Sequence, residues 1–407
     1  MKTLGLIGLD IAKDTFTAAF LLVDLDTHTL LGEHIQTFPY DRQGWQAFLA
    51  TWQRFAAPDF WLLGLEASGP YSALLEDHLL SLHRTDMALH RLSPAQVRDF
   101  AKSRSRRRTK TDRLDARTLA LFLLQQWTIH SLPQPLSPDA PTPLASLAHL
   151  YDHFTQELTR IQNQVRQLLH YLFPELERRS PRFSKALRTL LLAFPSAQAL
   201  AQASLADLQQ TLSSAQARHL PLQELHLLAQ TSFGRHDPYR AQSLRFLLHL
   251  WEHLEQQRQR LLRLLVQAVQ QRFPRAWHLL TAIPGIGPTL AALFLALVGD
   301  IRRFPSPKAL VAYAGLDIIQ HQSGKFLGRP RLSKRGSPLL RHVLYLMAVA
   351  LKRYTHRFAQ AYAYYRQQGR AVRETLVILA RKALIMLYHL LSRQIPFQDS
   401  PPAGAPL

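Results

Sequence analysis

The chain has 407 residues, of which 47% are hydrophobic, so it is long enough for two or three domains and is not a disordered polymer. Its 49 lysines and arginines against 28 acids give a net charge of +21, which favours a polyanionic partner such as nucleic acid. The absence of cysteine excludes disulfides, thiolate zinc sites and cysteine nucleophiles.

Residues 1–135 are predicted to form an α/β domain. Apolar runs of strand length occupy 4–12, 16–24 and 60–66, and helix-like segments follow at 43–55 and 71–82. Strands that alternate with helices favour a mixed sheet covered by helices. A proline-rich segment comes next, and we expect a linker at 136–145.

Residues 146–272 are predicted to be helical. Leucines and other apolar residues recur at steps of three and four along 147–172 and again along 247–269, a heptad-like pattern. The two stripes predict arms of a coiled coil, and both a dimerisation arm and an internal helical hairpin remain open. Residues 273–393 are expected to be mostly helical, with a loop rich in Gly and Arg at 315–337, and 394–407 to be a disordered tail.

No apolar run reaches the roughly 18 residues that a membrane span needs, and the apolar stretch 289–298 is too short. The first residues lead directly into a strand-like segment, without a signal sequence. We therefore expect a cytoplasmic protein with no membrane partner.

Four carboxylates stand at positions typical of a ligand site. Asp10 (in GLDIAK) and Glu66 (in LEASGPY) end predicted strands, and Asp112 and Asp115 (in KTDRLDA) begin a predicted helix with their side chains on one face. Together they predict an oxygen cage for Mg²⁺, or alternatively Mn²⁺. The alternative is a set of turn residues and acids favoured by the helix dipole.

A basic stretch precedes the acidic pair and is a candidate phosphate-binding segment. Its alternative is a solvated loop. The candidate residues are Lys102, Arg104, Arg106, Arg107, Arg108 and Lys110.

The C-terminal region has three further features of interest. The glycines Gly285 and Gly287 in IPGIG predict a turn that opens a helix, as in a helix-hairpin-helix, where amides approach a phosphate; a plain connector is the alternative.

Ser323 is a candidate nucleophile inside a basic loop, and Ser333 and Ser337 are competitors that look more like phosphate-binding residues. The basic candidates in this loop are Lys325, Arg329, Arg331, Lys334 and Arg335.

These motifs, in this order and spacing, resemble the IS-one-ten family of transposases. GLDIAK, LEASGPY and KTDRLDA resemble its DEDD RuvC-like domain, and IPGIG, FPSPKALVAYAGL, the SG pair and LSKRGSPLLR resemble its C-terminal transposase domain. One departure is Asp317 and Ile318, where the family often has a proline soon after the AGL element.

The resemblance implies a ribonuclease-H-like N-terminal fold, Mg²⁺ bound by Asp10, Glu66, Asp112 and Asp115, and Ser323 as the nucleophile. It further implies donor and target DNA, a non-coding guide RNA of the bridge type, a homodimer or homotetramer, and a bacterial, nucleoid-associated location. Two rival hypotheses are a RuvC-like junction nuclease that uses water and a non-catalytic nucleic-acid-binding protein.

Overall fold

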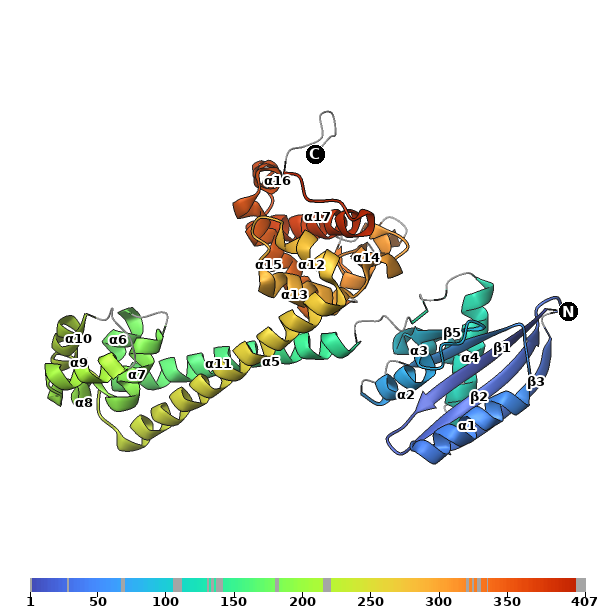
Figure 1. Cartoon of the computed structure of the whole chain (residues 1–407), viewed down its shortest axis with the longest axis horizontal. Coiled ribbons are helices and arrows are strands. Elements are labelled where there is room, and N and C mark those ends of the chain that lie inside the picture. The colour runs from blue at the N-terminus through green and yellow to red at the C-terminus, as the bar shows by residue number, and fades with distance from the viewer. Residues whose placement is uncertain are drawn as a thin grey trace. The chain divides into compact units, whose positions relative to one another are not determined.

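The computed structural model divides the chain into an N-terminal unit, Met1–Ala140, and a C-terminal unit, Pro141–Leu407 (Figure 1). The structure describes residues 2–27, 29–66, 70–104, 112–129, 132, 135–136, 142–179, 183–214, 221–319, 322–323, 326–327, 331–334 and 336–399. Within helices and strands it describes the backbone alone for residues 70, 95, 104, 112, 142–143, 179, 214, 319, 322–323 and 326–327.

A mixed sheet forms the centre of the N-terminal unit, in the order β3-β2-β1-β4-β5. β1 pairs antiparallel with β2, and β2 with β3, whereas β4 runs parallel to β1 and β5 parallel to β4. The three strands predicted from apolar runs are confirmed as β1, β2 and β4, and β3 and β5 are additional. The strands are β1 (Thr3–Ile11), β2 (Thr15–Asp24), β3 (Leu30–Pro39), β4 (Phe60–Glu66) and β5 (Met87–Leu92).

Helices cover both faces of this sheet (Figure 1). On one face, α1 (Arg42–Phe55) and α2 (Pro70–Leu80) pack against the odd-numbered residues of β1, such as Ile7 and Leu9. On the other face, α3 (Pro94–Arg104) and α4 (Asp112–Thr128) pack against the even-numbered residues, such as Leu4 and Leu6. Because β1 and β4 are buried on both faces, they read as nearly continuous apolar runs.

Helix α4 lies unusually close to the sheet at two glycines. A Cβ on Gly8 of β1 would lie 2.1 Å from the carbonyl oxygen of Ala116, and a Cβ on Gly64 of β4 would lie 2.7 Å from a methyl group of Leu123. Any larger residue at these positions would push the helix away from the sheet. The two glycines therefore set the distance between α4 and the two strands that carry Asp10 and Glu66 near their ends.

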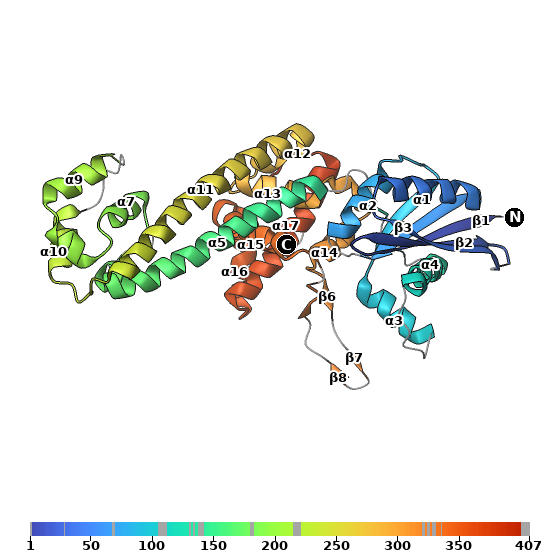
Figure 2. The same cartoon turned by 90° about the horizontal axis from the view of Figure 1, so that it is seen from below.

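Two long helices, α5 (Thr142–Leu172) and α11 (Pro238–Arg272), lie side by side and run in opposite directions in the C-terminal unit (Figures 1 and 2). Both predicted heptad-like stripes lie within them, and apolar residues such as Val165 and Leu248 are fully buried. The pairing within one chain agrees with the internal helical hairpin that the sequence left open.

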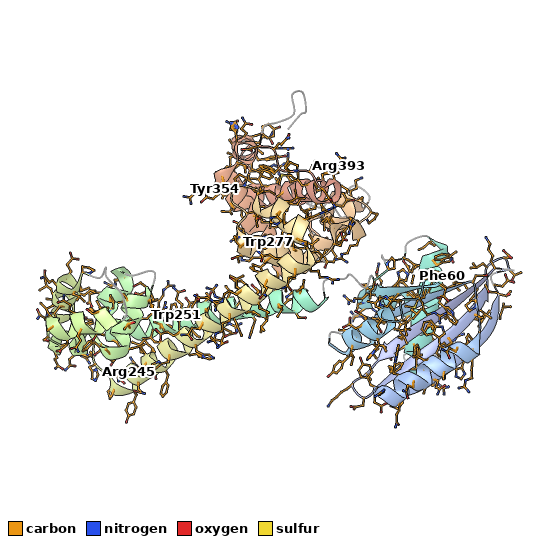
Figure 3. All side chains as sticks on the ribbon, in the orientation of Figure 1. Phe60, Arg245, Trp251, Trp277, Tyr354 and Arg393 are labelled. Atoms are coloured by element: carbon orange, nitrogen blue, oxygen red, sulfur yellow. The ribbon has the colours of Figure 1, made fainter. Side chains whose placement is uncertain are left out.

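Five short helices pack on the far end of this hairpin around their own apolar cluster. Trp251 of α11 anchors this packing, because its ring lies 5.8 Å from that of Phe183 and 5.0 Å from the guanidinium group of Arg188 (Figure 3). The helices are α6 (Pro174–Arg179), α7 (Lys185–Ala193), α8 (Ala197–Gln202), α9 (Leu205–Ser214) and α10 (Leu222–Gln230).

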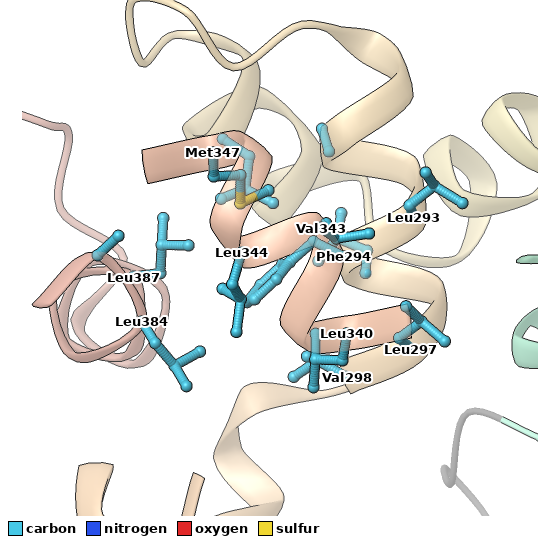
Figure 4. Close-up of a cluster of buried hydrophobic side chains, with 14 of the residues drawn as sticks. Leu293, Phe294, Leu297, Val298, Leu340, Val343, Leu344, Met347, Leu384 and Leu387 are labelled. Atoms are coloured by element: carbon cyan, nitrogen blue, oxygen red, sulfur yellow. The ribbon is translucent and has the colours of Figure 1, made fainter. Parts of the chain in front are cut away.

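The remainder of the C-terminal unit is a helical bundle. Buried side chains of α13, α15 and α17 converge at its centre, among them Phe294, Leu344 and Leu387 (Figure 4). Its helices are α12 (Pro274–Thr281), α13 (Pro288–Val298), the 3-10 turn Ile301–Arg303, α14 (Pro307–Ala314), α15 (Pro338–Tyr354), α16 (His356–Gln367) and α17 (Val372–Arg393). The bundle confirms the expected helical character of this region.

The structure corrects two predicted boundaries. Leu136 donates a backbone hydrogen bond to Leu89 and so belongs to the N-terminal unit, and α5 begins at Thr142, inside the linker predicted at 136–145. The predicted disordered tail at 394–407 is wrong for 394–399, because Asp399 accepts hydrogen bonds from the first amides of α16 and Phe397 packs on the bundle. Residues 400–407 lie outside the described residues.

One helix in the described part of the chain, α17, is long and apolar enough to cross a membrane. Half of its most apolar stretch is buried within the bundle, as is usual for the core helix of a globular unit.

We expect Gly8→Ala to lower the free energy of unfolding by roughly 1–3 kcal/mol, because the new methyl group forces α4 off β1. Thermal and urea unfolding measure this effect. The matched control is Gly32→Ala on edge strand β3, where the nearest atom to an added Cβ is 3.6 Å away and no loss is expected. Equal stability of the two variants would contradict the tight packing of α4.

Candidate functional site

The ends of β1 and β4 bring two of the predicted carboxylates next to each other. The strands are parallel neighbours and pair as far as Leu9 with Leu65, so the next residues, Asp10 and Glu66, lie at the same level of the sheet. Side chains alternate along a strand, which places both carboxylates on the same face as Gly8 and Gly64. Both are partly buried. The structure therefore brings these two positions together at one edge of the sheet.

That face is the one that α4 covers. Ala116 is fully buried and its carbonyl lies against Gly8, two residues before Asp10. Asp115 immediately precedes Ala116 and is partly buried. Asp112 is the first residue of α4, and its side chain is not described. The first turn of α4 thus begins at the sheet face that carries Asp10 and Glu66.

Two arginines fix this turn against the edge strand β3. Arg117 Nε donates to Glu33 Oε1 at 2.6 Å, and Arg113 Nη2 donates to the carbonyl oxygen of Ile35 at 3.1 Å. The hydrogen bond to Glu33 raises the pKa of Arg117. The sequence alone did not reveal these anchors, because β3 carries few buried residues and did not stand out as a strand.

The donor set fits a hard cation. Carboxylate oxygens without nitrogen or sulfur ligands suit Mg²⁺ or Mn²⁺. Within the described residues no group of three or more His, Asp or Glu side chains is close enough to hold a metal ion. Asp10 and Glu66 share one face of the sheet, Asp115 lies in the first turn of α4, and Asp112 is the fourth donor that the sequence pattern predicts.

Two of the six basic candidates that precede α4, Lys102 and Arg104, lie within the described residues. Lys102 is exposed on α3, with Nζ 3.9 Å from a carboxylate oxygen of Asp99. Arg104 ends α3, and its side chain is not described. The remaining candidates lie outside the described residues: Arg106, Arg107, Arg108 and Lys110.

The region predicted as a loop at 315–337 contains two short antiparallel strand pairs instead. β6 (Ile318–Ile319) pairs with β9 (Arg331–Leu332), and β7 (Gln322–Ser323) pairs with β8 (Phe326–Leu327). Figure 2 shows the second pair farther from the bundle than the first. The backbone of Ser323 faces that of Phe326, and the side chain of Ser323 is not described.

The base of this hairpin is held by Asp317, the residue at which the sequence departs from the family. Its carboxylate accepts a hydrogen bond from the Ser333 hydroxyl, and its carbonyl accepts one from the Ser333 amide at 2.9 Å. Lys334 adopts φ +54° and donates its amide to Gly315 at 3.3 Å. Asp317 thus joins the two ends of the segment that carries Ser323.

The two competing serines, Ser333 and Ser337, both make hydrogen bonds within the fold, and their place in a phosphate-binding loop stays a prediction. Ser333 binds Asp317, and Ser337 is the N-cap of α15, where its hydroxyl accepts from the Leu340 amide at 3.3 Å. Among the basic candidates, Arg331 and Lys334 are exposed. Lys325, Arg329 and Arg335 lie outside the described residues.

The predicted glycine turn opens α13 as expected, and its two glycines differ. Gly285 has φ +90°, and a Cβ there would lie 2.8 Å from the ring of Tyr354, so this glycine serves close packing on α15. Gly287 is the N-cap of α13, and no atom lies within 4 Å of an added Cβ. Of the two, only Gly287 offers space for an approaching phosphate.

Two family models match the chain. The DEDD transposase model of the IS110 type matches residues 7–174, and the model described as the IS116/IS110/IS902 transposase family matches residues 277–365. The first covers both strand-end carboxylates and the start of α4, and the second covers the glycine turn and the hairpin with Ser323.

Curated relatives agree with these matches. A protein of insertion element IS110 from Streptomyces coelicolor is 28% identical over 73% of this chain and 74% of its own length. The pilin gene-inverting protein of Moraxella lacunata is 32% identical over 29% of this chain and 38% of its own length. The transposase of element IS1111A from Coxiella burnetii is 34% identical over 28% of this chain and 32% of its own length. The chain therefore belongs to the IS110 family of transposases, enzymes that cleave and rejoin DNA.

Proposed function

We propose that the chain is the transposase of an insertion sequence and recombines DNA through a phosphoserine intermediate on Ser323. In this proposal a Mg²⁺ ion is held by Asp10, Glu66, Asp112 and Asp115. The observation that supports it best is the placement of Asp10 and Glu66 at neighbouring strand ends, on the face where α4 begins. The strand order β3-β2-β1-β4-β5 is consistent with the ribonuclease-H-like fold that the family implies.

The carboxylates supply negative charge at one edge of a sheet in a strongly basic protein. Asp10 and Glu66 follow the carboxyl ends of neighbouring parallel strands, which is where ligands of α/β sheets commonly bind. A bound Mg²⁺ ion would supply positive charge beside the scissile phosphate. Asp10, Glu66, Asp112 and Asp115 are the residues that would hold this ion.

In the proposed step, the Ser323 oxygen forms a bond to phosphorus, and the bond from phosphorus to the departing sugar oxygen breaks. The serine hydroxyl loses its proton, and the departing oxygen ends as a hydroxyl group, so charge and atoms balance. A sugar hydroxyl of another strand then attacks the phosphoserine and restores the serine. One phosphodiester is exchanged for another, and no external energy source is needed.

Basic residues would hold the nucleic acids. The net charge of +21 and the predicted segments around Lys102–Lys110 and Lys325–Arg335 support binding of donor and target DNA. A guide RNA of the bridge type, implied by the family, would supply sequence choice by base pairing. A homodimer or homotetramer would allow several strands to be exchanged together.

We expect Asp10→Asn, Glu66→Gln and Asp115→Asn each to reduce Mg²⁺-dependent DNA cleavage at least about a hundredfold, because each removes a charged ligand. Cleavage of labelled DNA over a Mg²⁺ titration measures this. Asp14→Asn is the control, since Asp14 is an exposed carboxylate just beyond β1. Retained cleavage in all three variants would exclude a carboxylate metal site, and unchanged DNA binding would separate catalysis from binding.

The serine mechanism predicts a covalent adduct. Wild-type protein with its co-expressed RNA, labelled donor and target DNA and Mg²⁺ should give a denaturation-resistant protein–DNA band. Ser323→Ala should abolish that band, whereas Ser337→Thr, which keeps a capping hydroxyl, should retain it. Cleaved DNA without an adduct, undiminished in Ser323→Ala, would instead identify a nuclease that uses water.

Asp317 should act as a positioning residue for Ser323. We expect Asp317→Ala to slow adduct formation about tenfold, the equivalent of one lost hydrogen bond, while the Kd for DNA stays unchanged. Ser333→Ala should have a similar effect, and the double variant should be little worse than either single variant. Fully additive effects, or an equal loss of DNA binding, would contradict a role through the hairpin base.

A further inference from the structure

A groove between α16 and α17 lies apart from every segment assigned above. Its volume is about 490 Å³, and its floor is apolar, with Phe358, Met386 and Ile385 among the lining side chains. Arg357, Lys382 and Arg393 also line it. None of the described residues that line it is acidic. The C-terminal family model ends at residue 365, so all of α17 lies beyond it.

Tyrosine rings continue the floor of the groove. Phe358, Ala361 and Tyr365 follow one another at steps of three and four and so share one face of α16. Lys382 lines the groove and also contacts Tyr365, because its Nζ lies 5.5 Å from the centre of the Tyr365 ring. Tyr364 packs edge-on against Tyr365 with the ring centres 5.2 Å apart, and it is 51% exposed.

The surroundings of the groove are strongly positive. Residues 352–393 contain nine lysines and arginines and one acid, Glu374, which forms an ion pair with Arg370. A second acid, Asp399, accepts hydrogen bonds from the amides of His356 and Arg357 at the start of α16. Tyr354 ends α15 and Arg393 ends α17 (Figure 3). Tyr354 is 56% exposed and has the guanidinium group of Arg353 5.4 Å from its ring centre.

We propose that the α16–α17 groove binds a single strand of nucleic acid. Cations along the groove would contact successive phosphates, and the apolar floor with Tyr365 and Tyr364 would stack unpaired bases. A duplex keeps its bases stacked inside and cannot use such a floor. A membrane surface is a poorer occupant, because the apolar residues of α17 are largely committed to the bundle core.

This inference rests on the proposed function, in which recombination exposes single strands of DNA and a guide RNA is present. Single strands of RNA and DNA both have a charged backbone and exposed bases, the two features that the groove is proposed to bind. The structure therefore assigns the class of ligand, and the test has an arm for each source.

The test is fluorescence anisotropy on the full-length chain, freed of nucleic acid and without Mg²⁺. The probes are labelled strands of about 20 nucleotides, as RNA, as DNA of the same sequence and as duplex DNA. Because no cutting is needed, failure of the Ser323 mechanism leaves this measurement valid, and loss of binding here leaves the adduct assay to be judged on its own.

We expect Lys382→Ala combined with Arg393→Ala to weaken single-strand binding about tenfold and to reduce the salt slope by about 1.4, as two lost phosphate contacts require. The matched control, Arg366→Ala combined with Arg373→Ala, removes the same charge from exposed positions that do not line the groove. It should change the Kd less than about twofold, as weak long-range charge effects do. Melting temperatures establish that each variant is folded.

Tyr365→Leu keeps the charge and removes a stacking ring, so it should weaken single-strand binding about fivefold to tenfold and leave duplex binding unchanged. A loss confined to the RNA probe or to the DNA probe would assign the source, and either supports the proposal. Equal losses in the groove and control pairs, equal losses for duplex and single strands, or full competition by polyglutamate would overturn it.

Discussion

Helix α4 packs closely on the sheet only because β1 and β4 carry glycine at the two points where the helix crosses them. At Gly8 the helix backbone occupies the space that any other side chain would take, and Ala116 and Ala120 of α4 are themselves small and fully buried. Close approach at this point fixes where α4 begins relative to Asp10. The arrangement of the carboxylates thus depends on a packing constraint that involves no carboxylate.

Some cations of this strongly basic protein stabilise the fold and are therefore not available to bind a ligand. Arg113 and Arg117 contribute to the net charge of +21 that favours a nucleic-acid partner, yet both bond to β3 and hold α4 in place. Arg341 likewise donates to the carbonyl groups of Ala314 and Gly336 and supports the base of the hairpin. An excess of positive charge in the sequence therefore overstates the number of cations available to a ligand.

Sequence reasoning succeeded where a pattern reflects burial on both sides. β1, β2 and β4 are continuous apolar runs because helices or neighbouring strands cover them, and the stripes of α5 and α11 reflect one buried face. It missed β3, whose residues are mostly exposed, and β5, which is only six residues long. It also treated 315–337 as a loop, because two-residue strands leave no periodic signal.

The sequence also predicted part of the candidate site, namely the carboxylates, but not the contacts that hold the hairpin. Motif spacing identified the acids, and strand pairing gives a physical basis for Asp10 and Glu66 lying together. The hydrogen bond between Asp317 and Ser333 joins residues 16 positions apart, and no local sequence pattern predicts it. The sequence departure at Asp317 was the only available signal. In this chain the Asp317 carboxylate ties the two ends of the segment that carries Ser323 together through a side-chain contact.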